Sequence, residues 1–326
     1  MTHIFDEQTV VNSSALPAGA ATSAKQDALL TELQKKADLT ETQPVEAKAG
    51  TALMGGVKLS DENGAIYGVK HVQNKPRVSA MPYTYDIAEG NVTDHVPWSK
   101  IGYNAAIGAT EEDMWPVSAP YVFPAGALTM TIVSDSVEDD ADKTPVAGTG
   151  AYTVTVYYLT TAFAEKNVTV TMNGTAAVQI ATDIYRIQNV RIMTAGTALA
   201  AVGNLTVASG GVTYGYISAG RTRARQCLWT VPAGKTLYIT QIAFSCADQA
   251  AGKYARFTTK ANYDNLSGTV LPRGLWSPYN EIILNNTAFL RELNPPTKLP
   301  ATVDLKVSAL ANSAAQGTCS LRGWIE

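Results

Sequence analysis

Short runs in which apolar and polar residues alternate dominate the chain and predict β-strands. The clearest are Leu128–Val133 and Tyr152–Tyr158. Asn173-Gly174 separates Val168–Met172 from Ala177–Ile180 and predicts a hairpin, because both turn residues tolerate positive φ. Strands at this spacing, with no long helical pattern between them, predict antiparallel β-sandwiches of jelly-roll or immunoglobulin-like type. Later strands are expected at Ile187–Met193, Asn204–Ala208, Leu228–Val231, Thr236–Phe244, Tyr254–Thr259, Glu281–Asn285, Thr302–Ser308 and Thr318–Ile325.

A weak internal repeat divides this β-rich part of the chain in two. Phe123-Pro-Ala-Gly126 precedes Leu128–Val133, and Val231-Pro-Ala-Gly234 precedes Leu237–Ile242, at an offset of 108 residues. The two copies indicate two tandem domains of about that length. We expect each Pro-Ala-Gly turn just before a strand near the edge of a sheet, where proline is tolerated.

One segment, Thr22–Asp38, has the pattern of an amphipathic helix. Ser23 and Gln26 have the spacing of a capping box, which marks its first turn. A helix of this length is marginal alone in water, so most of its stability must come from burial against a partner. Its apolar residues form one narrow stripe: Leu29, Leu30, Leu33 and Ala37.

The sequence allows three partners for this apolar stripe: the core of its own domain, symmetry-related copies in a short parallel bundle, or a larger assembly. Two heptads do not fix an oligomer number, although we favour a homotrimer. Residues 1–21 contain the apolar pair Val10-Val11 and resemble an extended arm that is ordered only when something else holds it. We therefore expect an oligomerisation or docking interface at Val10, Val11, Leu29, Leu30, Leu33 and Ala37.

The sequence thus predicts a mainly β protein in four parts. An N-terminal arm, helix and linker span residues 1–49. A small β-hairpin and crossing segment spans 50–104, with Asn63-Gly64 as its turn. Two tandem sandwiches span 105–217 and 218–326.

Composition and charge exclude several classes of partner. Charged residues make up 16% of the 326 residues, against roughly 25% in ordinary globular chains. The net charge of −3 and the lack of a basic half disfavour nucleic acid as a partner. Ala195–Ser209 is too short to span a bilayer, and the first residues do not form a signal peptide, so no membrane partner is expected.

No motif indicates catalysis or a cofactor. Ala233-Gly-Lys-Thr236 echoes the end of a phosphate-binding loop, but Trp229 stands where its first glycine should, and a strand follows it. A pair of carboxylates on distant strands, as in a glycosidase, would leave no local motif, and no pair is indicated. The three cysteines are far apart and are expected as small buried residues of a protein made in a reducing cytoplasm: Cys227, Cys246 and Cys319. The histidines have no metal-ligand spacing: His3, His71 and His95.

Two charged runs have alternative interpretations. Arg221, Arg223 and Arg225 can face an acidic surface, although an exposed interdomain connector is the simpler interpretation. An acidic run can bind calcium or form a solvated loop, and we favour the loop because the spacing of a calcium-binding loop is missing. Its members are Asp135, Glu138, Asp139, Asp140 and Asp142.

Two blocks of the sequence resemble virion structural proteins of tailed bacteriophages. The first is Leu16-Pro-Ala-Gly-Ala-Ala-Thr-Ser-Ala-Lys-Gln-Asp27 with the leucines that follow it. The second is Gly102–Trp115 with Tyr121–Gly126, after which come Thr-rich strands and a turn like Val231–Thr236. The resemblance covers about half of the chain and does not specify a place on the particle.

What the resemblance implies is a non-enzymatic virion protein without a cofactor, made in the bacterial cytoplasm. The first hypothesis is a capsid decoration protein or head fibre that docks on the major capsid protein or other virion proteins. The second is a neck, collar or tail component. The third is a carbohydrate-binding or depolymerising tail protein, with a host surface glycan as its partner.

Overall fold

The computed structural model is mainly β and describes residues 28, 70–72, 75–77, 83–247, 252–265 and 275–326. It contains two units, residues 1–79 and 80–326. In the first, β1 (Lys70–Val72) pairs with β2 (Lys75–Arg77), and Ala28 is helical. The rest of the expected helix, the Asn63-Gly64 turn and the interface residues Val10, Val11, Leu29, Leu30, Leu33 and Ala37 lie outside the described residues.

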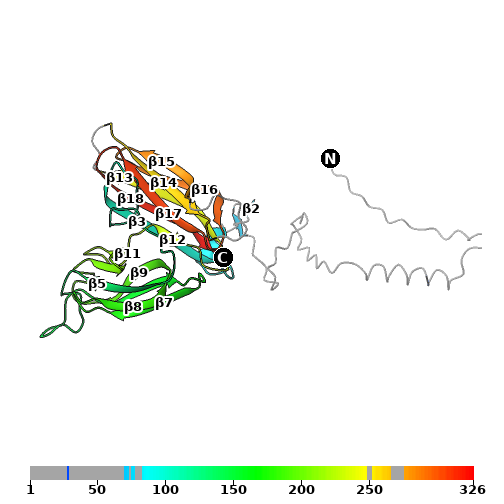
Figure 1. Cartoon of the computed structure of the whole chain (residues 1–326). Helices are drawn as coiled ribbons and strands as arrows, with labels where there is room; N and C mark the ends of the chain where they lie inside the picture. The colour runs from blue at the N-terminus through cyan, green and yellow to red at the C-terminus, as the bar shows by residue number, and fades with distance from the viewer. Residues whose placement is uncertain (1–27, 29–69, 73–74, 78–82, 248–251, 266–274) are drawn as a thin grey trace, which may run out of the picture. The chain divides into compact units, whose positions relative to one another are not determined.

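The second unit contains four antiparallel sheets, which form two lobes (Figure 1). The inserted lobe has the sheets β11-β10-β5-β8 and β7-β6-β9. Its strands are β5 (Leu128–Ser134), β6 (Ala151–Leu159), β7 (Glu165–Thr171), β8 (Val178–Ile184), β9 (Arg186–Ala195), β10 (Leu205–Ser209) and β11 (Val212–Ile217).

The C-terminal lobe has the sheets β16-β13-β18-β3 and β12-β17-β14-β15, and β4 also pairs with β17. A short helix, α2 (Tyr83–Ala88), precedes it. Its strands are β3 (Val96–Ile107), β4 (Glu112–Asp113), β12 (Leu228–Thr230), β13 (Leu237–Ala247), β14 (Ala255–Asn262), β15 (Ser277–Leu284), β16 (Ala288–Leu299), β17 (Asp304–Ala311) and β18 (Ala315–Ile325).

Each lobe has its own hydrophobic core, to which both of its sheets contribute. Ile132 and Val154 are fully buried in the inserted lobe, and Phe244 and Phe257 stack in the C-terminal lobe with ring centroids 5.4 Å apart. Strands such as β5 and β18 alternate buried and more exposed positions, because successive side chains point to opposite faces of a sheet.

The two lobes share one strand order. In the inserted lobe β5 lies between β8 and β10, and β6 lies between β7 and β9. In the C-terminal lobe β13 lies between β16 and β18, and β14 lies between β15 and β17. The repeated Pro-Ala-Gly turn precedes the matching strands β5 and β13. The expectation that these strands lie near an edge is wrong, and proline is tolerated because the turn ends before the ladder begins.

The lobes are nested in the chain rather than placed in tandem. β3 and β4 precede the inserted lobe in sequence, yet they pair with β18 and β17 of the C-terminal lobe, as Figure 1 shows for β3 and β18. The boundary expected at residue 104 therefore falls inside a continuous strand. The chain leaves the edge of β17 after Met114 and returns to the same edge at Cys227, whose N–H donates to Met114 O at 2.9 Å.

The sequence pattern located most strands after residue 105 but not all of their pairings. The expected hairpin at Asn173-Gly174 is wrong, because β7 pairs with β6 whereas β8 pairs with β5. The turn instead carries the chain from one sheet to the other. Strands β3, β4, β11 and β16 were not predicted.

Candidate functional site: the junction between the lobes

The junction between the two lobes is organised around β17, which is buried on both faces. Leu305, Val307 and Ala309 contribute to the core of the C-terminal lobe. The alternate residues of the same strand are polar and also buried: Asp304, Lys306 and Ser308. Because buried polar groups must find partners, this second face dictates what the inserted lobe has to supply.

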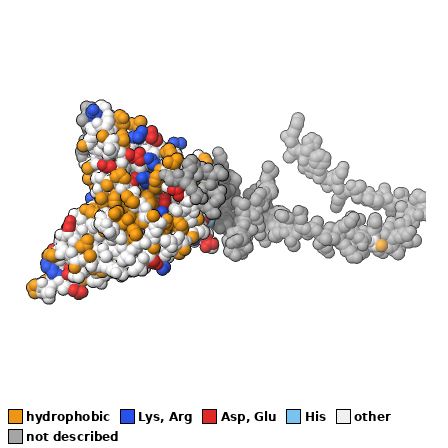
Figure 2. Space-filling model, viewed as in Figure 1, with side chains coloured by type: hydrophobic (Ala, Val, Ile, Leu, Met, Phe, Trp, Pro, Cys, Tyr) orange, Lys and Arg blue, Asp and Glu red, His pale blue; other side chains and the backbone are white. Residues whose placement is uncertain are grey.

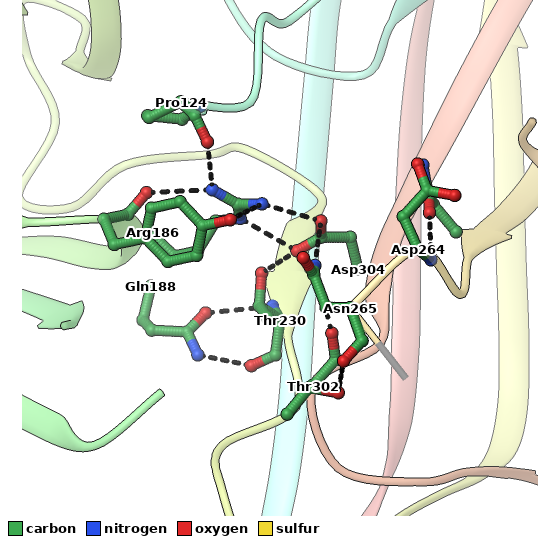
Figure 3. A network of polar contacts seen from close by, with 10 residues as sticks. Pro124, Arg186, Gln188, Thr230, Asp264, Asn265, Thr302 and Asp304 are labelled. Atoms are coloured by element: carbon green, nitrogen blue, oxygen red, sulfur yellow. Dashed lines mark hydrogen bonds and ion pairs between the residues drawn. The ribbon is translucent and has the colours of Figure 1, made fainter. Parts of the chain in front are cut away.

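Arg186 of β9 meets Asp304 in a buried ion pair (Figure 3). The guanidinium donates to both carboxylate oxygens, from Nε to Oδ1 at 2.9 Å and from Nη2 to Oδ2 at 3.0 Å. Both side chains are about 5% exposed or less, so solvent screens the pair very little. The bidentate geometry fixes direction as well as distance, and it joins the first residue of β17 to the first residue of β9.

The remaining polar atoms of this ion pair also have partners. Arg186 donates to Pro124 O at 2.6 Å, and its guanidinium lies 3.8 Å from the Tyr185 ring centroid. Asp304 accepts further hydrogen bonds from Thr230 Oγ1 and Asn265 Nδ2. Burial opposes the charge on Arg186, yet the paired carboxylate holds the pKa of the guanidinium above its ordinary value.

A second ion pair lies where the chain enters the inserted lobe. Lys306 Nζ is 3.0 Å from Asp113 Oδ1, and Ser308 Oγ donates to the same oxygen at 2.7 Å. The other carboxylate oxygen accepts the backbone N–H of Tyr121 at 2.6 Å, so Asp113 links β17 to the first loop of the inserted lobe. Asp113 thus has partners from both sides of the junction, and Lys306, which lies on the same side as Asp113, compensates its charge.

Gln188 and Lys100 complete the junction. The Gln188 amide forms two hydrogen bonds with the backbone of Thr230 in β12 (Figure 3). Its Nε2 donates to Thr230 O, and its Oε1 accepts the N–H of Thr230. Lys100 of β3 donates to Gln188 O, and its ammonium lies 5.1 Å from the Trp229 ring centroid. Burial lowers the pKa of Lys100 to about 8.

One member of the acidic run, Asp139, is an internal brace, whereas Asp135 and Asp142 are exposed as expected for a solvated loop. Asp139 is fully buried, and it accepts from Ser134 Oγ at 2.6 Å and from Ala151 N at 2.7 Å. It also accepts from Val202 N at 2.9 Å and Gly203 N at 2.8 Å. One carboxylate thus holds three loop segments together. Within the part of the chain that the structure describes, no group of three or more His, Cys, Asp or Glu is placed to hold a metal ion.

Of the other residues singled out in the sequence, His3 and the side chain of His71 lie outside what the structure describes. Arg221 and Arg223 are exposed on the connector that leaves the inserted lobe, and the Arg225 guanidinium lies 4.0 Å from the Tyr103 ring centroid. His95 bonds Tyr83 Oη at 2.8 Å and pairs with Glu326. The three cysteines are buried, as expected: Cys227, Cys246 and Cys319.

Sequence reasoning missed every residue of the junction. Arg186 and Asp304 are far apart in the chain, and neither stands in a motif. The available signal was weak: Asp304, Lys306 and Ser308 alternate with apolar residues, a pattern that a strand exposed on one face also produces.

Acidic and basic side chains are interspersed on the face shown in Figure 2, and neither sign dominates it. None of the helices that the structure describes is long and apolar enough to cross a membrane.

Comparisons with known proteins gave no family. No family model matches the chain, and no curated protein matches it. Solved structures with some similarity come from infectious bursal disease virus. The Gt strain structure has 8% identity and a TM-score of 0.17, over 75% of this chain and 80% of the other. The T=1 particle structure has 9% identity and a TM-score of 0.18, over 76% and 78%. The VP2 subviral particle structure has 9% identity and a TM-score of 0.15, over 75% of this chain and 81% of the other. TM-scores this low do not establish a common fold, and we carry no function over from them.

Proposed function

We propose that this protein is a non-enzymatic structural component of a virus particle, namely a capsid decoration protein or head fibre of a tailed bacteriophage. The observation that carries the proposal is the junction, where the buried ion pair of Arg186 and Asp304 joins two β-lobes and Asp113 also binds the first loop of the inserted lobe. Asp304 and Asp113 are each held by several donors, so these carboxylates serve packing rather than proton transfer. A body of this kind is suited to holding a fixed shape in an assembly.

The strand order supports the same proposal. We interpret each lobe as a jelly-roll sandwich, in which consecutive strands mostly alternate between two facing sheets. Jelly rolls recur in viral capsid proteins and in lectins. The sequence blocks Leu16–Asp27 and Gly102–Trp115, which resemble phage virion proteins, point in the same direction.

We assign attachment to the N-terminal region, with the chain itself and a capsid protein as partners. The apolar stripe Leu29, Leu30, Leu33 and Ala37, with Val10-Val11, would form a homotrimer or dock on the shell. The alternative positions are the neck, collar or tail. A count of copies per purified particle separates them, because hundreds indicate the shell, whereas a dozen or fewer indicate the neck or tail.

The decisive variant is Leu30→Asp with Leu33→Asp in the full chain. We expect it to abolish oligomers and particle attachment while circular dichroism stays unchanged, because charges cannot be buried in an apolar stripe. The matched control is Ala28→Asp with Lys35→Gln, which makes the same change of two charge units on the opposite face of the same predicted helix. Sedimentation and particle binding that match wild type in both variants would refute an attachment role for the stripe.

A further inference from the structure

A cleft of about 420 Å³ opens beside the junction, where the outer face of the sheet β7-β6-β9 meets β12. Its volume lies within the range of about 300–1,000 Å³ that small-molecule sites occupy, and such sites are frequent where two domains meet. The side chains that carry the argument are Tyr157, Asn167, Asn189, Arg191 and Trp229, and Glu165 also lines the cleft.

Three of these side chains form a row across the sheet. In the register of the strands, Tyr157 of β6 is opposite Asn167 of β7 on one side and Asn189 of β9 on the other. Directly opposed residues point to the same face, with Cβ atoms about 4.5–5.5 Å apart. An aromatic ring is therefore flanked by two amides on one surface, and Trp229 of β12 contributes to the wall beside it.

The polar groups of this row, and the nearby Arg191, are available to a ligand. Asn167 and Arg191 are exposed, and neither side chain has a hydrogen bond or ion pair to another described residue. Asn189 Oδ1 accepts only its neighbour's N–H, from Val190 at 3.0 Å, which leaves its amide donors for other partners. The adjacent Lys166 differs, because it is held by Asp183 at 2.7 Å.

The Trp229 ring is fixed in place. The Lys100 ammonium lies 5.1 Å from its centroid, and Trp98 meets it edge to face at 5.7 Å. A ring that is already immobilised loses little entropy when a ligand packs against it.

We propose that this cleft binds a saccharide of about one or two sugar units. A sugar ring presents apolar C–H groups on its faces and hydroxyls on its rim, so it needs aromatic rings beside amide and guanidinium donors. Tyr157 and Trp229 supply the aromatic rings, while Asn167, Asn189 and Arg191 supply the amide and guanidinium donors. The row is too polar for an apolar peptide, and the net charge of −3 is wrong for nucleic acid. The inference does not depend on a place in a virion.

The test uses the full-length protein on an array of oligosaccharides that contain glucose, galactose, N-acetylglucosamine or glucuronate. Each saccharide that binds is then titrated calorimetrically into wild type, Asn167→Ala and Arg191→Ala. Both substitutions are at exposed positions, so folding should be retained, and this is checked by circular dichroism. We expect the Kd to rise about tenfold or more in each variant, the loss expected for one or two ligand hydrogen bonds.

Tyr85→Ala is the matched control, because Tyr85 is an exposed aromatic residue of α2 that does not line the cleft. Its Kd should stay within about twofold of wild type. The proposal is overturned if no saccharide on the array binds. It is also overturned if binding is lost in Tyr85→Ala while both cleft variants retain it, or if the cleft variants change sedimentation instead of saccharide affinity, which would indicate a second copy as the occupant.

Discussion

Two buried lysines of the C-terminal lobe are stabilised in different ways. Lys306 pairs with Asp113, so its charge is compensated inside the junction. Lys100 instead donates to a backbone carbonyl, of Gln188, and faces the π-system of Trp229. Those contacts offset only part of the desolvation, which explains why its pKa falls from 10.5 to about 8.

The lowered pKa of Lys100 predicts a pH dependence of stability. Between about pH 8 and 10.5 the unfolded chain binds the proton of Lys100 more often than the folded protein does. The free energy of unfolding therefore gains a positive contribution from this residue as pH rises through that window. In Lys100→Met this contribution disappears. Urea titrations from pH 7.5 to 9.5 should show a less positive slope for the variant than for wild type.

The difference between the two slopes gives the contribution of Lys100 to the pH dependence of stability. Groups whose pKa is raised by burial, such as Cys319 and Tyr121, contribute with the opposite sign in both proteins. Lys253→Met, at an exposed position, is the control and should match the wild-type slope. If the slope of Lys100→Met also matches it, Lys100 remains charged when buried and the assignment fails.

At the scale of the element, β3 shows why sequence pattern located some strands and missed others. Trp98, Lys100, Gly102, Asn104 and Ile107 occupy its buried positions. Two of the five are polar because they meet partners across the junction and in β4, so the usual contrast between an apolar and a polar face is lost. β16 is an edge strand with mostly exposed positions and two prolines, and it gives no alternation either. By contrast, β5 and β18 face a single apolar core and were predicted.

The pairing of β3 predicts where the chain can be shortened. A chain that begins at Ala80 retains β3 and should unfold cooperatively, because residues 80–326 form one compact unit. A chain that begins at Gly108 lacks β3, one of the two strands that pair with β18, and leaves β18, with Cys319 and Leu321, as a new sheet edge. We expect it to aggregate. Thermal unfolding and sedimentation of the two shortened chains make the comparison, and a soluble, cooperative chain from Gly108 would show that β3 is dispensable.

At the scale of the whole molecule, the nested topology explains why the candidate site could not be predicted from the sequence. The junction joins residues from β3, β9, β12 and β17, which local patterns place in four separate runs. The pairing of β4 and β12 along the same edge of β17, together with the pairing of β3 with β18, brings these runs together. The predicted N-terminal interface has the opposite character, because an amphipathic period is a local signal. It stays a prediction.

The ion pair of Arg186 and Asp304 should make the two lobes unfold as one. Removing one partner leaves a buried, uncompensated charge, which costs about 3–5 kcal/mol, whereas replacing both by apolar residues of similar volume is often nearly neutral. Arg186→Met and Asp304→Leu should therefore each lower stability strongly, and the double variant should recover much of the loss. Calorimetry should show one transition for wild type and two for each single variant, because a weakened junction no longer couples the cores.

The prediction fails if the loss of unfolding free energy in the double variant equals the sum of the losses in the two single variants. The two residues would then act independently. The lobes would then be held together by their remaining contacts, with Asp113, which accepts the N–H of Tyr121, as the next residue to test.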